Sequence, residues 1–232
     1  QPSVNRETQA QIIHTMDQPI QKDTYLVGPG DQFQINILTS DDVFTYKLVV
    51  SPSGEILIPS VGVIQVYGFT LNETIQSMES LIQLWNQNAL IHITLSQIRE
   101  FKIKVIGHLQ NPGLYSATPV SRVSDIFETI QKETEVVEND PDLVYPELSR
   151  RNIHIIRNGD SLHVDLVKFG TTGKDQYNPF VQQGDMIVIP LKQHVSSIFG
   201  GIKKPGEYEY VPHETLFEVI QLAGEIRPDA DP

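Results

Sequence analysis

Short runs in which apolar and polar residues alternate predict several β-strands in the first third of the chain. Phe33, Ile35 and Ile37 alternate with polar neighbours, which is the period of a strand buried on one face. Further short strands are predicted at residues 46–50, 55–58, 61–64 and 91–95. Because residues 51–54 are turn formers, we interpret the first two of these runs as a strand pair joined across that turn.

A helix is predicted between these strands by its start signal and by its apolar face. Thr70 is suited to the N-cap position, and Glu73, three residues later, completes a capping box. The apolar stripe consists of Leu71, Ile75, Met78, Ile82 and Trp85. Its spacing of three and four residues predicts that it faces the core. Residues 23–98 are therefore predicted to form a small α+β domain, preceded by a polar, glutamine-rich tail at 1–22.

A second domain is predicted at residues 99–192. It opens with a strand in which Phe101, Ile103 and Val105 alternate with lysines and which turns back at Asn111-Pro112-Gly113. A short helix follows, with an apolar face formed by Val123, Ile126, Phe127 and Ile130. The acidic stretch 133–150 after this helix is interpreted as a solvated insertion.

The strongest hairpin signal in the chain is Asn158-Gly159, a pair favoured in two-residue type I′ turns. It joins predicted strands at 153–157 and 160–166. The predicted register places Arg157 opposite Asp160, Ile155 opposite Leu162, and Ile153 opposite Val164. His154 and His163 then face each other on the other side of the hairpin. Gly184-Asp185 introduces a last strand at 186–189.

The chain also contains an internal repeat, which begins a third predicted unit at 193–232. The segment IGHLQNPGLY at 106–115 recurs without a gap as FGGIKKPGEY at 199–208, 93 residues later. At the same offset Val123, Ile126 and Phe127 correspond to Leu216, Val219 and Ile220. The second copy lacks a counterpart of the hairpin and the last strand. We therefore expect its helix face to need cover, either from a longer natural chain or from a neighbouring molecule.

The amino-acid composition argues against several classes of partner and of functional site. The 232 residues include 29 acidic and 17 basic side chains, a formal charge of −12, which argues against nucleic acid as a partner. The absence of cysteine excludes disulfides, thiolate zinc sites, iron–sulfur clusters and a cysteine nucleophile. No apolar run approaches the roughly 20 residues of a membrane helix.

The sequence offers no recognisable catalytic, metal-binding or cofactor-binding residues, and so no enzyme is predicted. Gly28-Pro29-Gly30-Asp31 is interpreted as a structural turn, because Pro29 removes a backbone donor that a phosphate cradle uses. His154 and His163 would need a third ligand to bind a metal. Tyr115 and Tyr208 occupy equivalent places after the two Pro-Gly turns, and they are the candidate glycan contacts, although packing against their own hairpins is the stronger interpretation.

These motifs, in this order, resemble a known family. The segment at 25–31, then Ser51-Pro52-Ser53-Gly54-Glu55 and Gly62-x-Ile64-x-Val66-x-Gly68, is similar to the polysaccharide export domain of outer-membrane export proteins of the Wza type. The repeated Gly-x-x-x-x-Pro-Gly-x-Tyr unit resembles the soluble-ligand-binding β-grasp (SLBB) module. The resemblance covers residues 24–232. Its motif residues are interpreted as structural: Gly28, Pro29, Gly30, Asp31, Gly54, Pro112, Gly113, Gly184, Asp185, Pro205 and Gly206.

The resemblance implies an α+β protein with a polysaccharide export domain, one complete β-grasp domain and the start of a second. It further implies a homo-oligomeric ring in the periplasm, associated with the outer membrane, through which a capsular or extracellular polysaccharide passes. An inner-membrane polysaccharide co-polymerase or export protein would be its partner. The chain departs from the family in having neither a cysteine for a lipid anchor nor an amphipathic helix after the second repeat. The alternative is a cell-envelope module that captures a soluble glycan or a partner protein without forming a channel.

Overall fold

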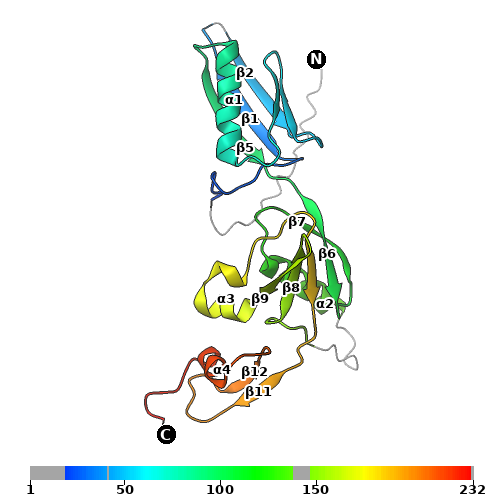
Figure 1. The fold of residues 1–232 in the computed structure, drawn as a ribbon, viewed down its shortest axis with the longest axis vertical. Helices are drawn as coiled ribbons and strands as arrows, with labels where there is room; N and C mark the ends of the chain where they lie inside the picture. Colours follow the sequence, from blue (N-terminus) through cyan, green and yellow to red (C-terminus); the bar gives the residue numbers. More distant parts are fainter. Residues whose placement is uncertain (1–18, 41, 138–146, 231–232) are drawn as a thin grey trace, which may run out of the picture.

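The computed structural model describes residues 19–40, 42–137 and 147–230. Three units follow one another along the long axis of the molecule (Figure 1). Each has its own cluster of buried apolar side chains, and we call them the N-terminal unit (Tyr25 to Ile98), the central unit (Phe101 to Ile189) and the C-terminal unit (Ile198 to Ala223). Helices and small sheets are mixed throughout, which confirms the predicted α+β class.

The N-terminal unit packs one helix against a small antiparallel sheet. The sheet has the order β2-β1-β5, and a separate hairpin is formed by β3 and β4. The bounds are β1 Gln32–Leu38, β2 Val43–Val49, β3 Glu55–Ile58, β4 Gly62–Gln65, α1 Leu71–Trp85 and β5 Leu90–Gln97. The central strand β1 buries every second side chain, as its alternation predicts.

The predicted pairing of residues 46–50 with 55–58 is wrong. β2 pairs with β1, and β3 pairs with β4. The turn between β2 and β3 closes through the Ser51 amide and the Glu55 carbonyl, but no ladder continues from it. The Gly54 carbonyl instead accepts hydrogen bonds from the amides of Val66 and Tyr67, which ties this turn to the chain after β4. A turn-forming sequence therefore marks a change of direction here, not a hairpin.

Helix α1 begins as predicted. The Glu73 amide donates to the Thr70 hydroxyl at 3.2 Å, and the Glu73 carboxylate accepts from the Thr70 amide at 2.8 Å. Leu71, Met78 and Ile82 are buried, but Trp85 at the end of the stripe remains 44% exposed. The predicted tail at 1–22 lies outside the described residues up to position 18.

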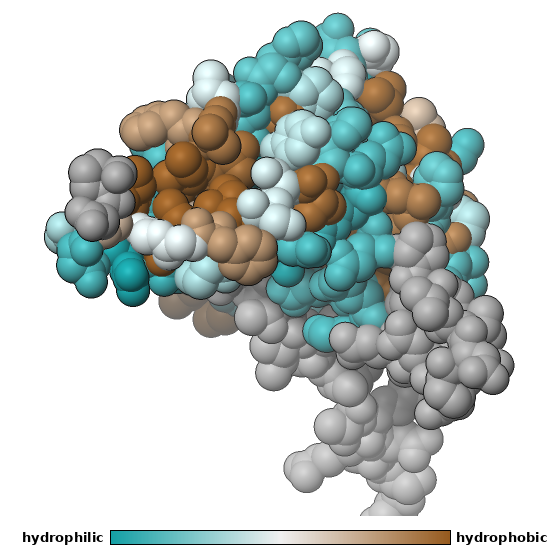
Figure 2. All heavy atoms as spheres, turned by 90° about the horizontal axis from the view of Figure 1, so that it is seen from below, coloured by the Kyte–Doolittle hydropathy of each residue, from teal (hydrophilic) through white to brown (hydrophobic). Residues whose placement is uncertain are grey.

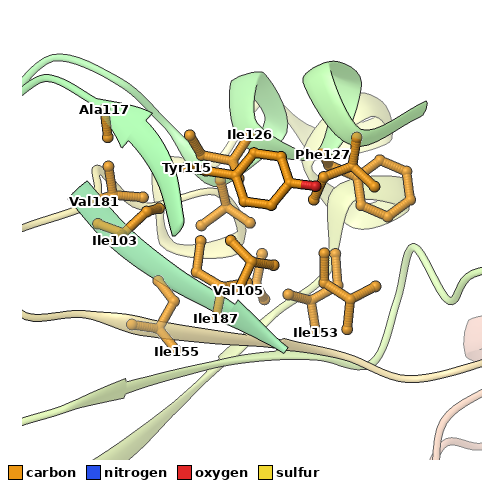
Figure 3. Close-up of a cluster of buried hydrophobic side chains, with 14 of the residues drawn as sticks. Ile103, Val105, Tyr115, Ala117, Ile126, Phe127, Ile153, Ile155, Val181 and Ile187 are labelled. Atoms are coloured by element: carbon orange, nitrogen blue, oxygen red, sulfur yellow. The ribbon is translucent and has the colours of Figure 1, made fainter. Parts of the chain in front are cut away.

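The central unit is a five-stranded mixed sheet covered by one long helix. The strand order is β7-β6-β10-β8-β9, with β10 parallel to β6. The bounds are β6 Phe101–Gly107, β7 Gly113–Ala117, α2 Val123–Val137, β8 Ile153–Arg157, β9 Asp160–Val164, α3 Leu166–Thr172, the 3₁₀ turn η1 Asp175–Tyr177 and β10 Met186–Ile189. Figure 3 shows its core, in which Ile126 and Phe127 of the helix meet Val105, Ile155 and Ile187 of the sheet.

The sequence predicts the β8–β9 hairpin residue by residue, but it misses part of its surroundings. All three predicted pairs of the Asn158-Gly159 hairpin are present. The second strand ends at Val164, two residues early, because the buried Asp165 caps the unforeseen helix α3 by accepting from the Lys168 amide at 2.8 Å. The prediction of a loop at residues 133–150 is also wrong at its start, because α2 continues to Val137. Residues 138–146 lie outside the described ranges.

The C-terminal unit repeats the first part of the central unit pair by pair. It consists of β11 Val195–Ile198, β12 Gly206–Glu209 and α4 Leu216–Leu222. Val105 lies opposite Gly113 in the first copy, and 93 residues later Ile198 lies opposite Gly206. Both helices start at equivalent positions, Val123 and Leu216. The repeat therefore extends from sequence to strand register.

One face of the C-terminal unit remains uncovered by any described strand. In the central unit the helix residue Val123 is buried, whereas its counterpart Leu216 on α4 is 69% exposed and the neighbouring Phe217 is 67% exposed. Figure 2, which looks onto this end of the molecule, shows hydrophobic residues gathered on its surface. Of the helix face that was expected to need cover, Val219 is buried and Ile220 packs partly buried against the same cluster, whereas Leu216 is exposed.

A buried ion-pair network joins the central and C-terminal units. Arg151 contacts Asp165 at 2.9 Å and Glu214 at 2.7 Å, and the side chains of all three residues are at most 1% exposed. Lys168 adds a second cation to Glu214 at 3.0 Å. Burial alone would raise the pKa of Glu214, but the hydrogen bonds from Arg151 and Lys168 outweigh it and hold that pKa below its usual value.

Candidate functional site

A cavity lies between the N-terminal and central units. This inter-unit cleft has a volume of about 620 Å³. Its N-terminal wall consists of residues 19–21, 24–29, 67–68 and 99, and its central wall of residues 101, 119–120, 175 and 180–183. The motif at 28–31 thus contributes to a cleft through Gly28 and Pro29, in addition to forming a turn.

The turn on the N-terminal wall is built around the buried carboxylate of Asp31. This carboxylate accepts hydrogen bonds from the Tyr25 hydroxyl at 2.7 Å, the Gly28 amide at 2.9 Å, and both the backbone and the guanidinium of Arg99 at 2.8 and 2.7 Å. Arg99 Nη1 also donates to the Leu26 carbonyl at 2.9 Å. Burial, and then the Asp31 charge, raise the pKa of Tyr25, so its hydroxyl stays protonated as a donor.

A second turn of the same construction lies on the central wall. The buried Asp185 accepts from the Gln182 amide at 2.7 Å and from Arg157 Nε and Nη2 at 2.8 and 2.7 Å. Arg157 Nη2 also donates to the Phe180 carbonyl at 2.9 Å. Gly184 has a φ of +93°, as Gly30 has +97° in the first turn, which is a conformation that side chains disfavour.

The two turns correspond at an offset of 154 residues, so that Leu26 matches Phe180 and Asp31 matches Asp185. Each is preceded by an isolated bridge to the residue before a helix: Leu26 to Thr70, and Phe180 to Arg122. Each leads directly into a strand. The cleft therefore lies between two turns of the same construction. In each turn an aspartate is held by an arginine from elsewhere in the fold.

The Asp31 and Asp185 turns provide a matched pair of stability tests. Asp31→Asn and Asp185→Asn are each expected to lower the free energy of unfolding by about 2 kcal/mol, because the partly buried arginine partner loses its counter-charge. Urea unfolding followed by circular dichroism measures this effect. Asp160→Asn, at an exposed position, is the control and should stay within about 0.5 kcal/mol of the parent. Equal effects at all three positions would contradict the assigned role of the carboxylates.

Aromatic side chains line the mouth of the cleft. Tyr67 is 66% exposed and Phe180 is 38% exposed. The Arg122 guanidinium carbon lies 4.1 Å from the centre of the Phe180 ring, and Arg122 also pairs with Asp175 at 3.0 Å. Neither aromatic residue stands out in the sequence, since a lone Tyr or Phe after a turn has no distinctive spacing.

The candidate glycan contacts from the sequence are placed away from this cleft. Tyr115 is buried in the central core, and its hydroxyl donates to the Asn111 carbonyl at 2.8 Å. Tyr208 makes the equivalent bond to the Lys204 carbonyl at 2.6 Å and is partly exposed. Burial, and then its bond to Glu133, raise the pKa of Tyr115 to about 12. Glycan contact by either tyrosine stays a prediction.

The remaining motif residues lie in turns. Pro112-Gly113 and Pro205-Gly206 lead into β7 and β12, and Gly54, with a φ of +82°, lies in the turn before β3. A Cβ on Gly54 would lie 2.4 Å from the Cβ of Tyr67, so this glycine allows the cleft tyrosine to pack closely. The structural interpretation of Gly54 thus gains a connection to the cleft.

The histidine pair is formed as predicted. His154 lies opposite His163, with ring centres 5.5 Å apart. Burial, and then the neighbouring imidazole, lower the pKa of His154, which favours its neutral form. Within the described ranges, no group of three or more His, Cys, Asp or Glu side chains is placed to hold a metal ion.

Comparison with known proteins confirms the resemblance to polysaccharide export proteins. Residues 19–96 match the family of polysaccharide biosynthesis/export proteins, which is a transport family and not an enzyme family. Over 207 residues, 88% of the chain, the protein is 26% identical to a polysialic acid transport protein KpsD of Escherichia coli and 25% identical to a second KpsD from that species. The chain spans about a third of the length of these relatives, since 34% of each is covered. No helix in the described part is long and apolar enough to cross a membrane.

Proposed function

We propose that this chain, whose residues 19–96 match the family of polysaccharide biosynthesis/export proteins, takes part in carrying a capsular or extracellular polysaccharide across the cell envelope. The observation that carries the proposal is the family match, extended by the alignment over 88% of the chain to proteins that transport polysialic acid. The protein would act without catalysis, in the periplasm and in association with the outer membrane. Its partners would be the polymer itself and an inner-membrane polysaccharide export protein.

The architecture we propose is an export domain at 23–98, a complete β-grasp domain of the SLBB type at 99–192 and part of a second one at 193–232. The residue-by-residue equivalence of β6–β7 and β11–β12 supports the assignment of two related units. The hydroxyls of Tyr115 and Tyr208 make the same bond to the carbonyl four residues earlier, which supports it further.

We also propose that the protein forms a homo-oligomeric ring. The exposed apolar residues Leu216 and Phe217 support an assembly contact, because large apolar side chains gathered on one face mark interaction surfaces. The chain carries a formal charge of −12, so the acidic side chains of a ring that passes an anionic polymer would lie mainly outside its lumen.

Light scattering over a range of protein concentrations tests the ring. We expect a large, discrete oligomer for the parent, and a lower mass for the double variant Leu216→Ser and Phe217→Ser, because it removes apolar contact area. Leu84→Ser, at an 83% exposed position of α1, is the matched control and should leave the mass unchanged. A monomer at every concentration would favour the alternative, a binding or adaptor module.

Deletion of the gene in the organism that makes the protein tests the transport role itself. We expect loss of surface polysaccharide and accumulation of polymer inside the envelope. Normal surface polysaccharide after deletion would contradict the proposed function.

A further inference from the structure

We propose that the inter-unit cleft binds a short segment of a glycan chain through sugar ring faces and hydroxyl groups, not through charge. This inference rests on the proposed function, because that function supplies the polymer. It assigns the contact to residues of the cleft, on both of its walls.

The dimensions of the cleft suit such a ligand. Its volume of about 620 Å³ lies within the range of roughly 300–1,000 Å³ that is typical of small-molecule sites. The walls come from two separately packed units, and boundaries between such units are preferred places for ligand sites.

The aromatic groups of the cleft are held in place before any ligand arrives. The Phe180 carbonyl is bound by Arg157, and its ring lies against the Arg122 guanidinium. The backbone of Tyr67 is fixed by the hydrogen bond from its amide to the Gly54 carbonyl at 3.1 Å, and the base of its side chain packs closely on that glycine. Rigid aromatic rings with an exposed surface offer large contact area at little cost in side-chain entropy.

The polar groups of the cleft favour an uncharged, hydroxyl-rich partner. Among the lining residues only Arg99 and Asp175 are charged, and each is paired, with Asp31 and Arg122 respectively. The exposed glutamines of the lining, at positions 21, 182 and 183, carry side-chain amides that both donate and accept, as sugar hydroxyls require. The buried Nε of Arg99 is a further donor without a partner in the described part of the chain. A strongly anionic ligand would find no unpaired cation among these residues.

Titration calorimetry with the full chain tests the inference. The probe is a fraction of six to ten sugar residues cut from the surface polysaccharide of the organism that makes the protein, and an oligosialic acid of similar length is titrated for comparison. We expect saturable binding that changes less than about twofold between about 50 and about 500 mM salt, because screening affects charge pairs and not ring stacking. Tyr67→Ala and Phe180→Ala should each weaken binding by about tenfold, since each removes one stacking surface.

Two controls make the result specific. Phe199→Ala removes an aromatic side chain that is 70% exposed on the C-terminal unit, away from the cleft, and should bind like the parent. Tyr210→Ala removes an exposed tyrosine side chain and should also bind like the parent. Absence of binding to the organism's own fragments would overturn the inference, as would equal loss in the control variants. Binding confined to oligosialic acid and abolished by salt would also overturn it.

The inference and the proposed function fail separately. If deletion of the gene removes the surface polysaccharide but the purified chain binds no fragment, the transport role stands and the cleft assignment falls. If deletion leaves the surface polysaccharide unchanged, the transport role falls, whatever the calorimetry shows.

Discussion

Replacing Gly107 with alanine is expected to lower the free energy of unfolding of the central unit by about 3–5 kcal/mol. Gly107 ends β6 with a φ of +131°, opposite Ile189 of the parallel strand β10. A Cβ at this position would lie 2.0 Å from the Ile189 carbonyl oxygen, so the two strands would have to separate. The variant therefore combines an unfavourable backbone conformation with a steric clash between the ends of two inner strands of the sheet.

The internal repeat supplies the control. Gly200, 93 residues later, also has a positive φ, +97°, but a Cβ there would meet no atom within 4 Å. Gly200→Ala should therefore cost only about 1 kcal/mol, which is the backbone contribution alone. Urea unfolding by circular dichroism measures both variants.

The single tryptophan offers an internal reference for the same experiment. Trp85 lies in the N-terminal unit, so its fluorescence follows that unit while circular dichroism follows the whole chain. Gly107→Ala should leave the tryptophan transition in place. Equal losses in Gly107→Ala and Gly200→Ala would show that β10 does not press against Gly107, and would contradict the sheet order described above.

The sequence predicts the features that depend on neighbours along the chain. The capping box of Thr70 and Glu73, the register set by Asn158-Gly159 and the alternation in β1 are local signals, and all are confirmed. The repeat is also visible, because self-similarity does not require knowledge of the fold. These signals suffice for the α+β class and for most strands.

Features that depend on contacts between distant segments could not be predicted in this way. The turn at 51–54 has the composition of a hairpin, yet β3 finds its partner in β4. Helix α3 has only seven residues, too few for an apolar period to be evident, and it is secured by the buried Asp165. In both cases tertiary contacts decide between alternatives that the local sequence leaves open.

The cleft illustrates the same limit for function. Asp31 and Arg99 are separated by 68 positions, and Arg157 and Asp185 by 28. An isolated arginine has no signature that identifies its partner. A signal was nevertheless available, because Gly-Asp precedes a strand at both Asp31 and Asp185, and a comparison of the chain with itself at this second offset would have joined the two turns.

Removal of Arg151 is expected to have an effect of similar size on the junction of the central and C-terminal units. Arg151→Met should lower the free energy of unfolding by about 3–5 kcal/mol at pH 7, because it leaves the buried carboxylates of Asp165 and Glu214 without their shared cation. The variant also loses the bond from Nη1 to the Glu209 carbonyl at 2.6 Å. The neighbouring Arg150→Met is the control, since the Arg150 side chain is exposed and should contribute less than about 1 kcal/mol.

The pH dependence of the same pair separates lost charge pairing from lost packing. In the parent the pKa of Glu214 is held low, so its contribution is complete above its unfolded pKa of about 4.3 and is lost as the pH falls through the folded value. Without Arg151, the burial that raises the pKa of Glu214 is opposed by Lys168 alone, so the pKa of Glu214 in the folded state should be higher in the variant than in the parent. As the pH falls, the folded variant then binds more protons than the folded parent. The gap in stability between Arg151→Met and the parent should therefore narrow as the pH falls from about 7 to about 4. A stability difference that stays constant over this range would assign the effect of Arg151 to packing. It would contradict an electrostatic role of the ion-pair network in joining the two units.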